Sequence, residues 1–219
     1  MVDKFFCLYI LAAYLIGSIP FGYLAGRLNG VDLRQHGSHN IGATNAVRVL
    51  GKKWGIPVFV CDFLKGYLPL LGAMAFMGGG TDVSQYSPGA MGWCLGVMVA
   101  LVLGHTFTCF LSFRGGKGVA TMAGCLVAFL PAVAGVAVVA FIAMMALTRY
   151  VSLSCLTAGL VMVVAAACLF CQDGTAPSPA EWMALGMLAL IFLLVLYKHR
   201  SNIVRICQGT EPKAFSKKK

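Results

Sequence analysis

Long apolar stretches that alternate with short basic segments form the dominant pattern of this 219-residue chain. Lysine and arginine are absent from residues 5–26, 66–113, 118–148 and 150–197. One helical crossing of a membrane takes about 20 apolar residues. The pattern therefore predicts membrane-spanning helices at about residues 5–26, 54–77, 91–111, 151–171 and 182–197.

The stretch 118–148 is less regular, because Gly124, Pro131 and Gly135 interrupt it. Its 31 residues are short for two full crossings. We expect a tight pair of helices that turns near Pro131, one of which need not cross fully. The prediction is a single all-α domain, residues 1–219, with about seven transmembrane helices.

Composition supports this reading. The chain is 59% hydrophobic and only 11% charged, whereas a soluble domain has about 25% charged residues. The net charge of +10 could indicate nucleic-acid binding, but the basic residues lie at span ends. We therefore expect an integral membrane protein in contact with the lipid bilayer and no nucleic-acid partner.

The placement of positive charge predicts the topology. Of 17 lysines and arginines, all but Lys4 lie in five clusters, at 27–65, 114–117, 149, 198–205 and 213–219. Cytoplasmic loops carry the excess of such residues. We expect the N-terminus outside and the C-terminus inside. The cytoplasmic segments would be about 27–53, 112–118, 149–152 and 198–219, and the loops that hold Asp82 and Asp173 would lie outside.

A glycine-rich basic segment interrupts the apolar pattern between residues 111 and 121. Glycines adopt positive φ readily, and successive amides turned to one point form a nest for anions, to which a following helix adds its dipole. Arg114 and Lys117 would add full charges. We expect Gly115, Gly116, Gly118 and Lys117 to form a phosphate-binding cradle.

Simpler interpretations of this segment are a chain turn and a cationic membrane anchor. A nucleotide P-loop is disfavoured, because that motif needs glycine where Leu111 stands and serine or threonine where Gly118 stands. We therefore expect no nucleotide ligand.

The other predicted cytoplasmic segments also carry donors and cations. A surface helix from Thr44 onward would present part of this set, and the only acids in these segments are Asp32 and Glu211. Such a surface suits doubly charged phosphate ligands. The candidate phosphate-binding side chains are Ser38, Asn40, Asn45, Arg48, Ser152, Ser154 and Arg205.

Other chemistries have little support. The chain has no Gly-x-Ser-x-Gly elbow and few acids to orient a Ser-His-Asp triad. His36 and His39 alone do not make a metal site. Asp62 and Lys65 lie three residues apart in a predicted span. Ionisable residues inside a span usually mark a functional site, although for this pair we favour a structural role. We expect no metal and no cofactor.

Three multi-residue motifs occur in order along the chain. The first is Gly-Ser-x-Asn-x-Gly-Ala-Thr-Asn at 37–45, and the second combines Gly-His-x-Phe at 104–107 with Phe-x-Gly-Gly-Lys-Gly-Val-Ala-Thr at 113–121. The third is His-Arg-x-Asn-Ile-x-Arg at 199–205, followed by Gly-Thr-Glu-x-Lys at 209–213. Together they resemble the motifs of the bacterial acyl-phosphate:glycerol-3-phosphate acyltransferases. The chain departs from the family pattern at Thr108 and Cys155, and neither change replaces a charged ligand.

This resemblance implies a multi-pass enzyme of the bacterial inner membrane with its active site at the cytoplasmic face. It would transfer a fatty acyl group from acyl phosphate to glycerol 3-phosphate, giving lysophosphatidic acid and phosphate, the first acylation of phospholipid synthesis. The matching positions imply catalytic roles for Lys117, His199 and Asn202, and substrate contacts for Ser38, Arg48 and Ser152. Whether His199 is a base or only a binding residue stays open. We expect a monomer.

The competing interpretation is a transporter or binding protein for phosphorylated metabolites that uses the same cationic surface. It would move its substrate without acyl transfer.

Overall fold

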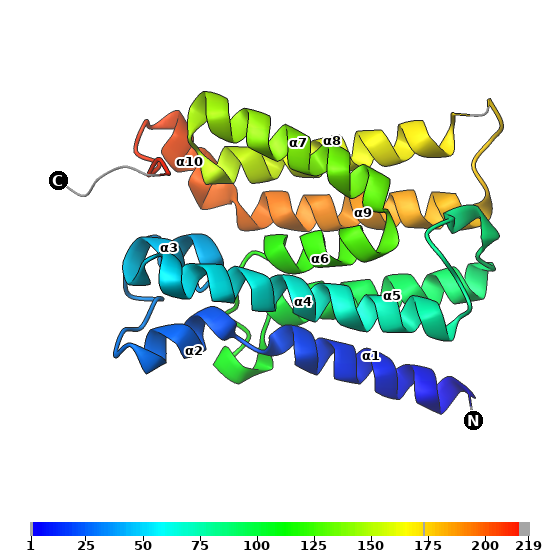
Figure 1. Ribbon diagram of the computed structural model, residues 1–219, viewed down its shortest axis with the longest axis horizontal. Coiled ribbons are helices and arrows are strands. Elements are labelled where there is room, and N and C mark those ends of the chain that lie inside the picture. Colours follow the sequence, from blue (N-terminus) through cyan, green and yellow to red (C-terminus); the bar gives the residue numbers. More distant parts are fainter. Residues whose placement is uncertain (1, 173, 215–219) are drawn as a thin grey trace. The chain divides into compact units, whose positions relative to one another are not determined.

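The computed structural model describes residues 2–172 and 174–214, and every regular element in them is a helix. The chain divides into two compact units. Unit 1 consists of Met1–Gly80 and Gly92–Phe129, and unit 2 of Thr81–Met91 and Leu130–Lys219. Figure 1 labels their helices along the chain.

Unit 1 contains the N-terminal helices. They are α1 (Val2–Ser18), α2 (Phe21–Leu28), α3 (Ala43–Leu50), α4 (Lys52–Phe76), most of α5 (Pro88–Thr106), the 3₁₀ turn η2 (Cys109–Leu111) and α6 (Val119–Phe129). The first predicted span is broken at Ile19–Pro20, because proline has no amide proton to continue the helix.

Close packing in unit 1 depends on small residues. Helix α4 lies beside α6 (Figure 1), and a side chain on Gly66 would overlap the Thr121 carbonyl while one on Gly124 would overlap that of Phe63. Glycines that let helix backbones approach are typical of membrane proteins. This contact places the start of α6 against the middle of α4.

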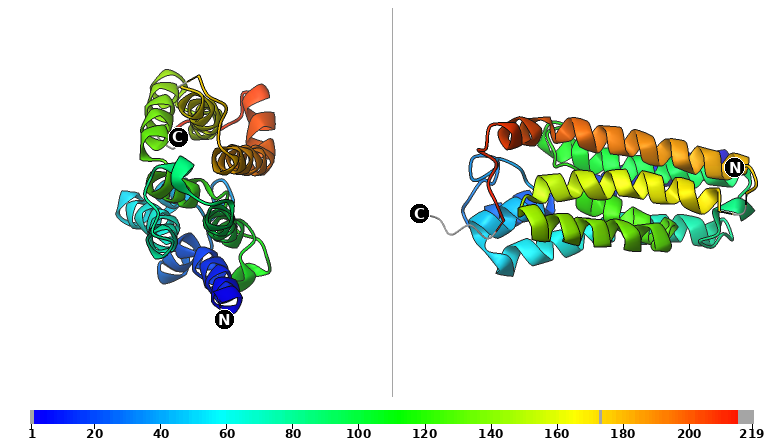
Figure 2. Two further views of the ribbon diagram at one scale, coloured as in Figure 1. Left: turned by 90° about the vertical axis from the view of Figure 1, so that its right-hand side faces the viewer. Right: turned by 90° about the horizontal axis from the view of Figure 1, so that it is seen from above.

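Unit 2 contains η1 (Val83–Gln85), α7 (Pro131–Thr148), α8 (Val151–Phe170), α9 (Pro179–Lys198) and α10 (Arg200–Cys207). Helices α7, α8 and α9 lie side by side in sequence order (Figure 2). Helix α9 begins with a capping box, in which Ser178 and Glu181 exchange side chain to backbone hydrogen bonds.

The prediction of an all-α integral membrane protein is confirmed. Six segments of the described chain are long and apolar enough to cross a membrane. They are Lys4–Leu28, Lys52–Phe76, Pro88–Leu111, Pro131–Thr148, Val151–Phe170 and Pro179–Lys198.

The expected turn near Pro131 is also present, since α6 ends at Phe129 and α7 begins at Pro131. Helix α6 has 11 residues, which at about 1.5 Å per residue reach only about half of a 30 Å hydrocarbon layer. The count of seven spans and the sidedness stay predictions, and Asp173 lies outside the described residues.

Candidate active site

The loop before α3 is organised around the buried side chain of Asn45, which is 1% exposed. Its Oδ1 accepts a 2.8 Å hydrogen bond from the Ser38 amide. Its Nδ2 lies 3.1, 3.0 and 2.8 Å from the carbonyl oxygens of Leu33, His36 and Asn40. One amide side chain thereby holds four backbone groups of residues 33–40 against the start of α3.

This arrangement corrects the role predicted for Asn45. Because the loop uses both its donor and its acceptor, Asn45 has no capacity left for a phosphate and instead shapes the loop that carries Ser38. The Asn40 side chain also closes the loop, accepting from the Gly42 amide over 2.8 Å. Arg48 lies half-buried in the last turn of α3.

The cradle loop, residues 112–118, joins η2 to α6. Ser112 and Phe113 adopt positive φ angles of 51° and 60°, and Gly118 has a φ of 79°. Gly118 directly precedes α6, and its carbonyl accepts from the Met122 amide over 2.8 Å. The predicted glycine-rich break before a helix is therefore present.

The predicted amide nest differs in one respect. Gly115 and Gly116 do not have positive φ, and their amides donate to the carbonyls of Thr106 and His105 over 3.1 and 3.0 Å. These two amides thus tie the loop to the end of α5 and are not available to an anion. Glycine is needed here for space, since a side chain on Gly116 would overlap the His105 imidazole.

Anion-binding capacity at the cradle comes from the start of α6. The first amides of a helix have no partner within the helix, and they carry the positive end of its dipole. Lys117 lies two residues before α6, with its side chain half-buried. A helix start of this kind favours an anion, and the phosphate-binding role of Lys117 stays a prediction.

In unit 2, three predicted site residues surround the carboxylate of Glu211. Ser152 Oγ and Asn202 Nδ2 each donate to Glu211 Oε1 over 2.7 Å. Arg205 Nε donates to Glu211 Oε2, also over 2.7 Å. Ser152 begins α8, whereas Asn202 and Arg205 lie on α10, so the carboxylate links two helices through the tail segment, residues 208–214.

The charge on Glu211 is stabilised by these donors. Burial opposes ionisation, but the hydrogen bonds from Asn202, Ser152 and Arg205, with the charge of Arg205, outweigh it and hold the pKa of Glu211 below its ordinary value. Ser152 has a single hydroxyl hydrogen, which is used in the hydrogen bond to Glu211. It can still accept a hydrogen bond, but it cannot donate to a phosphate at the same time.

The tail segment is fixed to the turn between α7 and α8. The Ala214 amide donates to the Arg149 carbonyl over 2.7 Å, and the Lys213 ammonium lies 5.6 Å from the centre of the Tyr150 ring. These contacts hold Glu211 beside the first residues of α8.

His199 is 2% exposed and lies between α9 and α10. Its Nδ1 lies 2.8 Å from the Val195 carbonyl oxygen. A carbonyl only accepts, so Nδ1 carries the proton and Nε2 is the basic nitrogen of the neutral ring. The contact fixes both the tautomer and the ring orientation.

The structure does not support a substrate contact for Ser154. This residue is fully buried in the first turn of α8, and its hydroxyl donates to the Tyr150 carbonyl over 2.9 Å. The sequence had not given Glu211 a role, although its status as one of two acids in the predicted cytoplasmic segments was a signal.

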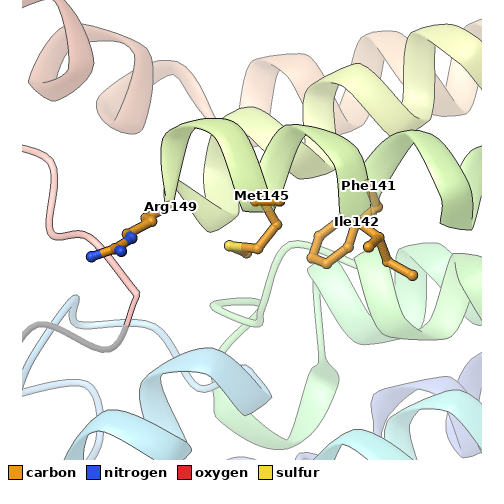
Figure 3. A pocket seen from close by; sticks show the side chains of 5 residues that line it. Phe141, Ile142, Met145 and Arg149 are labelled. Carbon is orange, nitrogen blue, oxygen red and sulfur yellow. The ribbon is translucent and has the colours of Figure 1, made fainter.

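A pocket of about 320 Å³ lies along one face of α7. The labelled side chains project from the same side of the helix (Figure 3). The lining residues are Phe141, Ile142, Met145, Ala146 and Arg149. Its lining is almost wholly apolar, with Arg149 at one end.

Comparison with known proteins decides the family. The sequence model of the family described as glycerol-3-phosphate acyltransferase matches residues 7–209. The chain belongs to the glycerol-3-phosphate acyltransferase family. It is an enzyme of that family, and the predicted family resemblance is confirmed.

Relatives match along nearly the whole length. Glycerol-3-phosphate acyltransferase 3 of Bacillus anthracis is 41% identical over 213 residues, with 96% of each chain covered. Glycerol-3-phosphate acyltransferase of Aquifex aeolicus is 40% identical over 202 residues, covering 92% of this chain and 95% of the relative.

Two solved structures share the fold. Both are crystal structures of PlsY (YgiH), an integral membrane glycerol 3-phosphate acyltransferase, and both are 38% identical to this chain. The glycerol 3-phosphate form superposes with a TM-score of 0.81 and 95% of each chain covered. The lysophosphatidic acid form has a TM-score of 0.77 and covers 95% of this chain and 94% of that one.

Proposed function

We propose that this acyltransferase uses acyl phosphate as its donor and acylates a hydroxyl of glycerol 3-phosphate at the cytoplasmic face of the bacterial inner membrane. The products are 1-acylglycerol 3-phosphate and inorganic phosphate. The protein acts as a monomer and uses neither a nucleotide nor a metal.

The observation that carries the proposal is the placement of Lys117 in the glycine-rich loop, two residues before α6 begins at Val119. An acyl phosphate is already activated, since phosphate is a good leaving group. The enzyme then has to position the two substrates and stabilise the charge that develops on the departing phosphate. An ammonium beside a helix N-terminus supplies that stabilisation without a covalent intermediate.

The reaction is a direct displacement. The glycerol hydroxyl oxygen forms a bond to the acyl carbon, and the bond between that carbon and the phosphate oxygen breaks. The hydroxyl proton passes to His199 Nε2, the nitrogen left basic by the Nδ1 contact with Val195. His199 then releases this proton to water, and the departing phosphate takes up one proton to become hydrogen phosphate. Lys117 and the amides at the start of α6 receive the phosphate that leaves.

Glycerol 3-phosphate is assigned to the polar groups elsewhere. In unit 1 the side chains assigned to glycerol 3-phosphate are Arg48 and Ser38. Arg205 uses its Nε on Glu211, so its terminal nitrogens can bind phosphate. The Ser152 hydroxyl donates its hydrogen bond to Glu211. Its oxygen therefore acts as an acceptor for a glycerol hydroxyl.

The test uses purified protein in detergent with acyl phosphate and glycerol 3-phosphate. We expect release of one phosphate for each 1-acylglycerol 3-phosphate formed, and no release when glycerol 3-phosphate is omitted. An absence of product in detergent, combined with uptake of phosphorylated metabolites into proteoliposomes, would establish the transporter alternative instead.

A labelled donor separates direct displacement from a covalent route. Incubation with acyl phosphate labelled in the acyl group, without glycerol 3-phosphate, should leave the protein unlabelled in intact-mass spectra. A stoichiometric adduct on Ser152, Ser154 or any cysteine would replace this mechanism with a two-step one.

A further inference from the structure

A buried ion pair lies in the middle of α4. Lys65 Nζ is 2.7 Å from Asp62 Oδ1, and the side chains are only 3% and 2% exposed. Lys65 also donates to the Ile19 carbonyl over 2.8 Å. Ionised groups within a membrane-spanning helix are costly and usually mark a functional element, and the family activity as derived above gives this pair no role.

The pair extends to two further helices. His105 Nδ1, on α5, lies 3.6 Å from Asp62 Oδ1 and 3.1 Å from Thr121 Oγ1 on α6. His105 is 5% exposed and Thr121 is fully buried. One imidazole nitrogen thus lies between a carboxylate of α4 and a hydroxyl of α6.

The opposite side of the same imidazole supports the cradle loop. A side chain on Gly116 would overlap His105 Nε2, so this nitrogen lies against the Gly116 Cα. The Gly116 amide also donates to the His105 carbonyl over 3.0 Å. The position of His105 therefore determines that of Gly116, and the next residue is Lys117.

Asp62 gives the imidazole a preferred orientation. Its negative charge faces Nδ1 and favours a proton on that nitrogen over one on Nε2. Removal of the charge weakens this preference and allows the ring to rotate or change tautomer, which moves the surface on which Gly116 rests. The ion partner Lys65 keeps the carboxylate from being an unpaired buried charge.

We propose that Asp62 and His105 are positioning residues for the cradle loop, connecting the ion pair of α4 to Gly116 and so to Lys117. The proposal rests on the proposed function, in which Lys117 receives the phosphate of the acyl donor. A pair that only holds helices together would affect stability and both substrates alike.

The first experiment removes the pair without leaving a charge. Asp62→Asn combined with Lys65→Met is neutral and similar in volume. We expect KM for acyl phosphate to rise about 10-fold or more, since displacement of a reacting group by about 1 Å costs up to 100-fold. KM for glycerol 3-phosphate should change less than about 2-fold, a difference within ordinary variation between sites that do not couple.

The second experiment is a double-mutant cycle between His105 and Gly116. Gly116→Ala alone should lower kcat/KM for acyl phosphate by about 10-fold or more because of the overlap with the imidazole. In a His105→Ala background the overlap is gone, so the same change should have a much smaller effect. Gly118→Ala is the matched control: its cost arises from a φ of 79° and from close contacts with Thr106 and Val102, not from the His105 ring. It should be equal in both backgrounds.

These outcomes separate the two proposals. Wild-type protein that forms no product in the same assay would refute the proposed function. Active wild-type protein with additive effects of His105→Ala and Gly116→Ala, or with both KM values rising together, would refute the positioning role alone. Melting temperatures of all variants, measured in the same detergent, show which ones have folded.

Discussion

The Ser152 hydroxyl donates a 2.7 Å hydrogen bond to the Glu211 carboxylate, although 59 residues separate them in the chain. The same carboxylate accepts from Asn202 and Arg205. A tail residue therefore sets the hydrogen-bonding state of three side chains predicted to bind substrate. Glu211 determines which of their protons remain available for a ligand.

Replacement of this carboxylate tests that arrangement. In Glu211→Gln an amide replaces the charge, and the hydrogen bonds from Ser152, Asn202 and Arg205 weaken. Loss of a hydrogen-bonded buried charge typically costs about 1–3 kcal/mol. We expect a lower melting temperature and a higher KM for glycerol 3-phosphate, measured by thermal unfolding in detergent and by phosphate release.

The pH dependence of this effect has a definite sign. Because the folded state lowers the pKa of Glu211, its ionisation stabilises the fold fully above the unfolded pKa of about 4.3. This contribution is lost as the pH falls through the lower folded value. The gap in melting temperature between wild type and Glu211→Gln should be constant near neutral pH and shrink below about pH 4. A gap independent of pH would show that Glu211 is not charged in the folded protein.

Asn45→Ala should act on stability and only indirectly on catalysis. The change removes contacts to Ser38, Leu33, His36 and Asn40 and leaves the buried Leu33 carbonyl unpaired, which typically costs about 1–3 kcal/mol. Proteolysis should cut residues 33–40 faster in the variant. Arg48→Gln, on the same helix, is the control: it should raise KM for glycerol 3-phosphate without faster cleavage.

Lys117→Met should lower turnover steeply while the protein stays folded. Removal of one preorganised charge contact at a developing anion costs about 3–4 kcal/mol, or roughly two to three decades of rate. Lys117→Arg should recover only part, since a planar guanidinium does not replace a compact ammonium. Arg114→Gln is the matched control in the same loop and should have a much smaller effect. Near-normal turnover of Lys117→Met at saturating substrates would refute the assignment of this loop as the site that binds the leaving phosphate.

A cysteine-accessibility map tests the sidedness. The excess of lysine and arginine predicts that cysteines at Arg114, Arg149 and Arg200 react only with reagent that reaches the cytoplasm, and one at Asp82 only from outside. Arg114 and Arg149 flank α6 and α7. Labelling of these two positions from opposite sides would show that the α6–α7 segment crosses the membrane an odd number of times.

Sequence patterns predicted the site unevenly, for a physical reason. The loop that carries Lys117 and the helix that starts after Gly118 were predictable from the sequence. A glycine-rich basic segment followed by an apolar run forms few structures other than a loop that leads into a helix. The direction of the Gly115 and Gly116 amides was not, because it depends on where the α5 carbonyls lie. Asn45 was predicted to bind phosphate from a surface helix, but residues 33–40 fold over its side chain and bury it.

The sequence by itself determined that this is a helical membrane protein, where its apolar spans lie and which family it belongs to. Runs of about 20 apolar residues form spanning helices whatever their neighbours are. The family motifs are defined by residue types at fixed spacings, so they can be recognised without a structure. Only the tertiary structure decided that Glu211 gathers Ser152, Asn202 and Arg205, and that Asp62 and His105 lie behind the cradle loop. Such contacts join residues tens of positions apart, and their distances follow from helix packing, which no local pattern records.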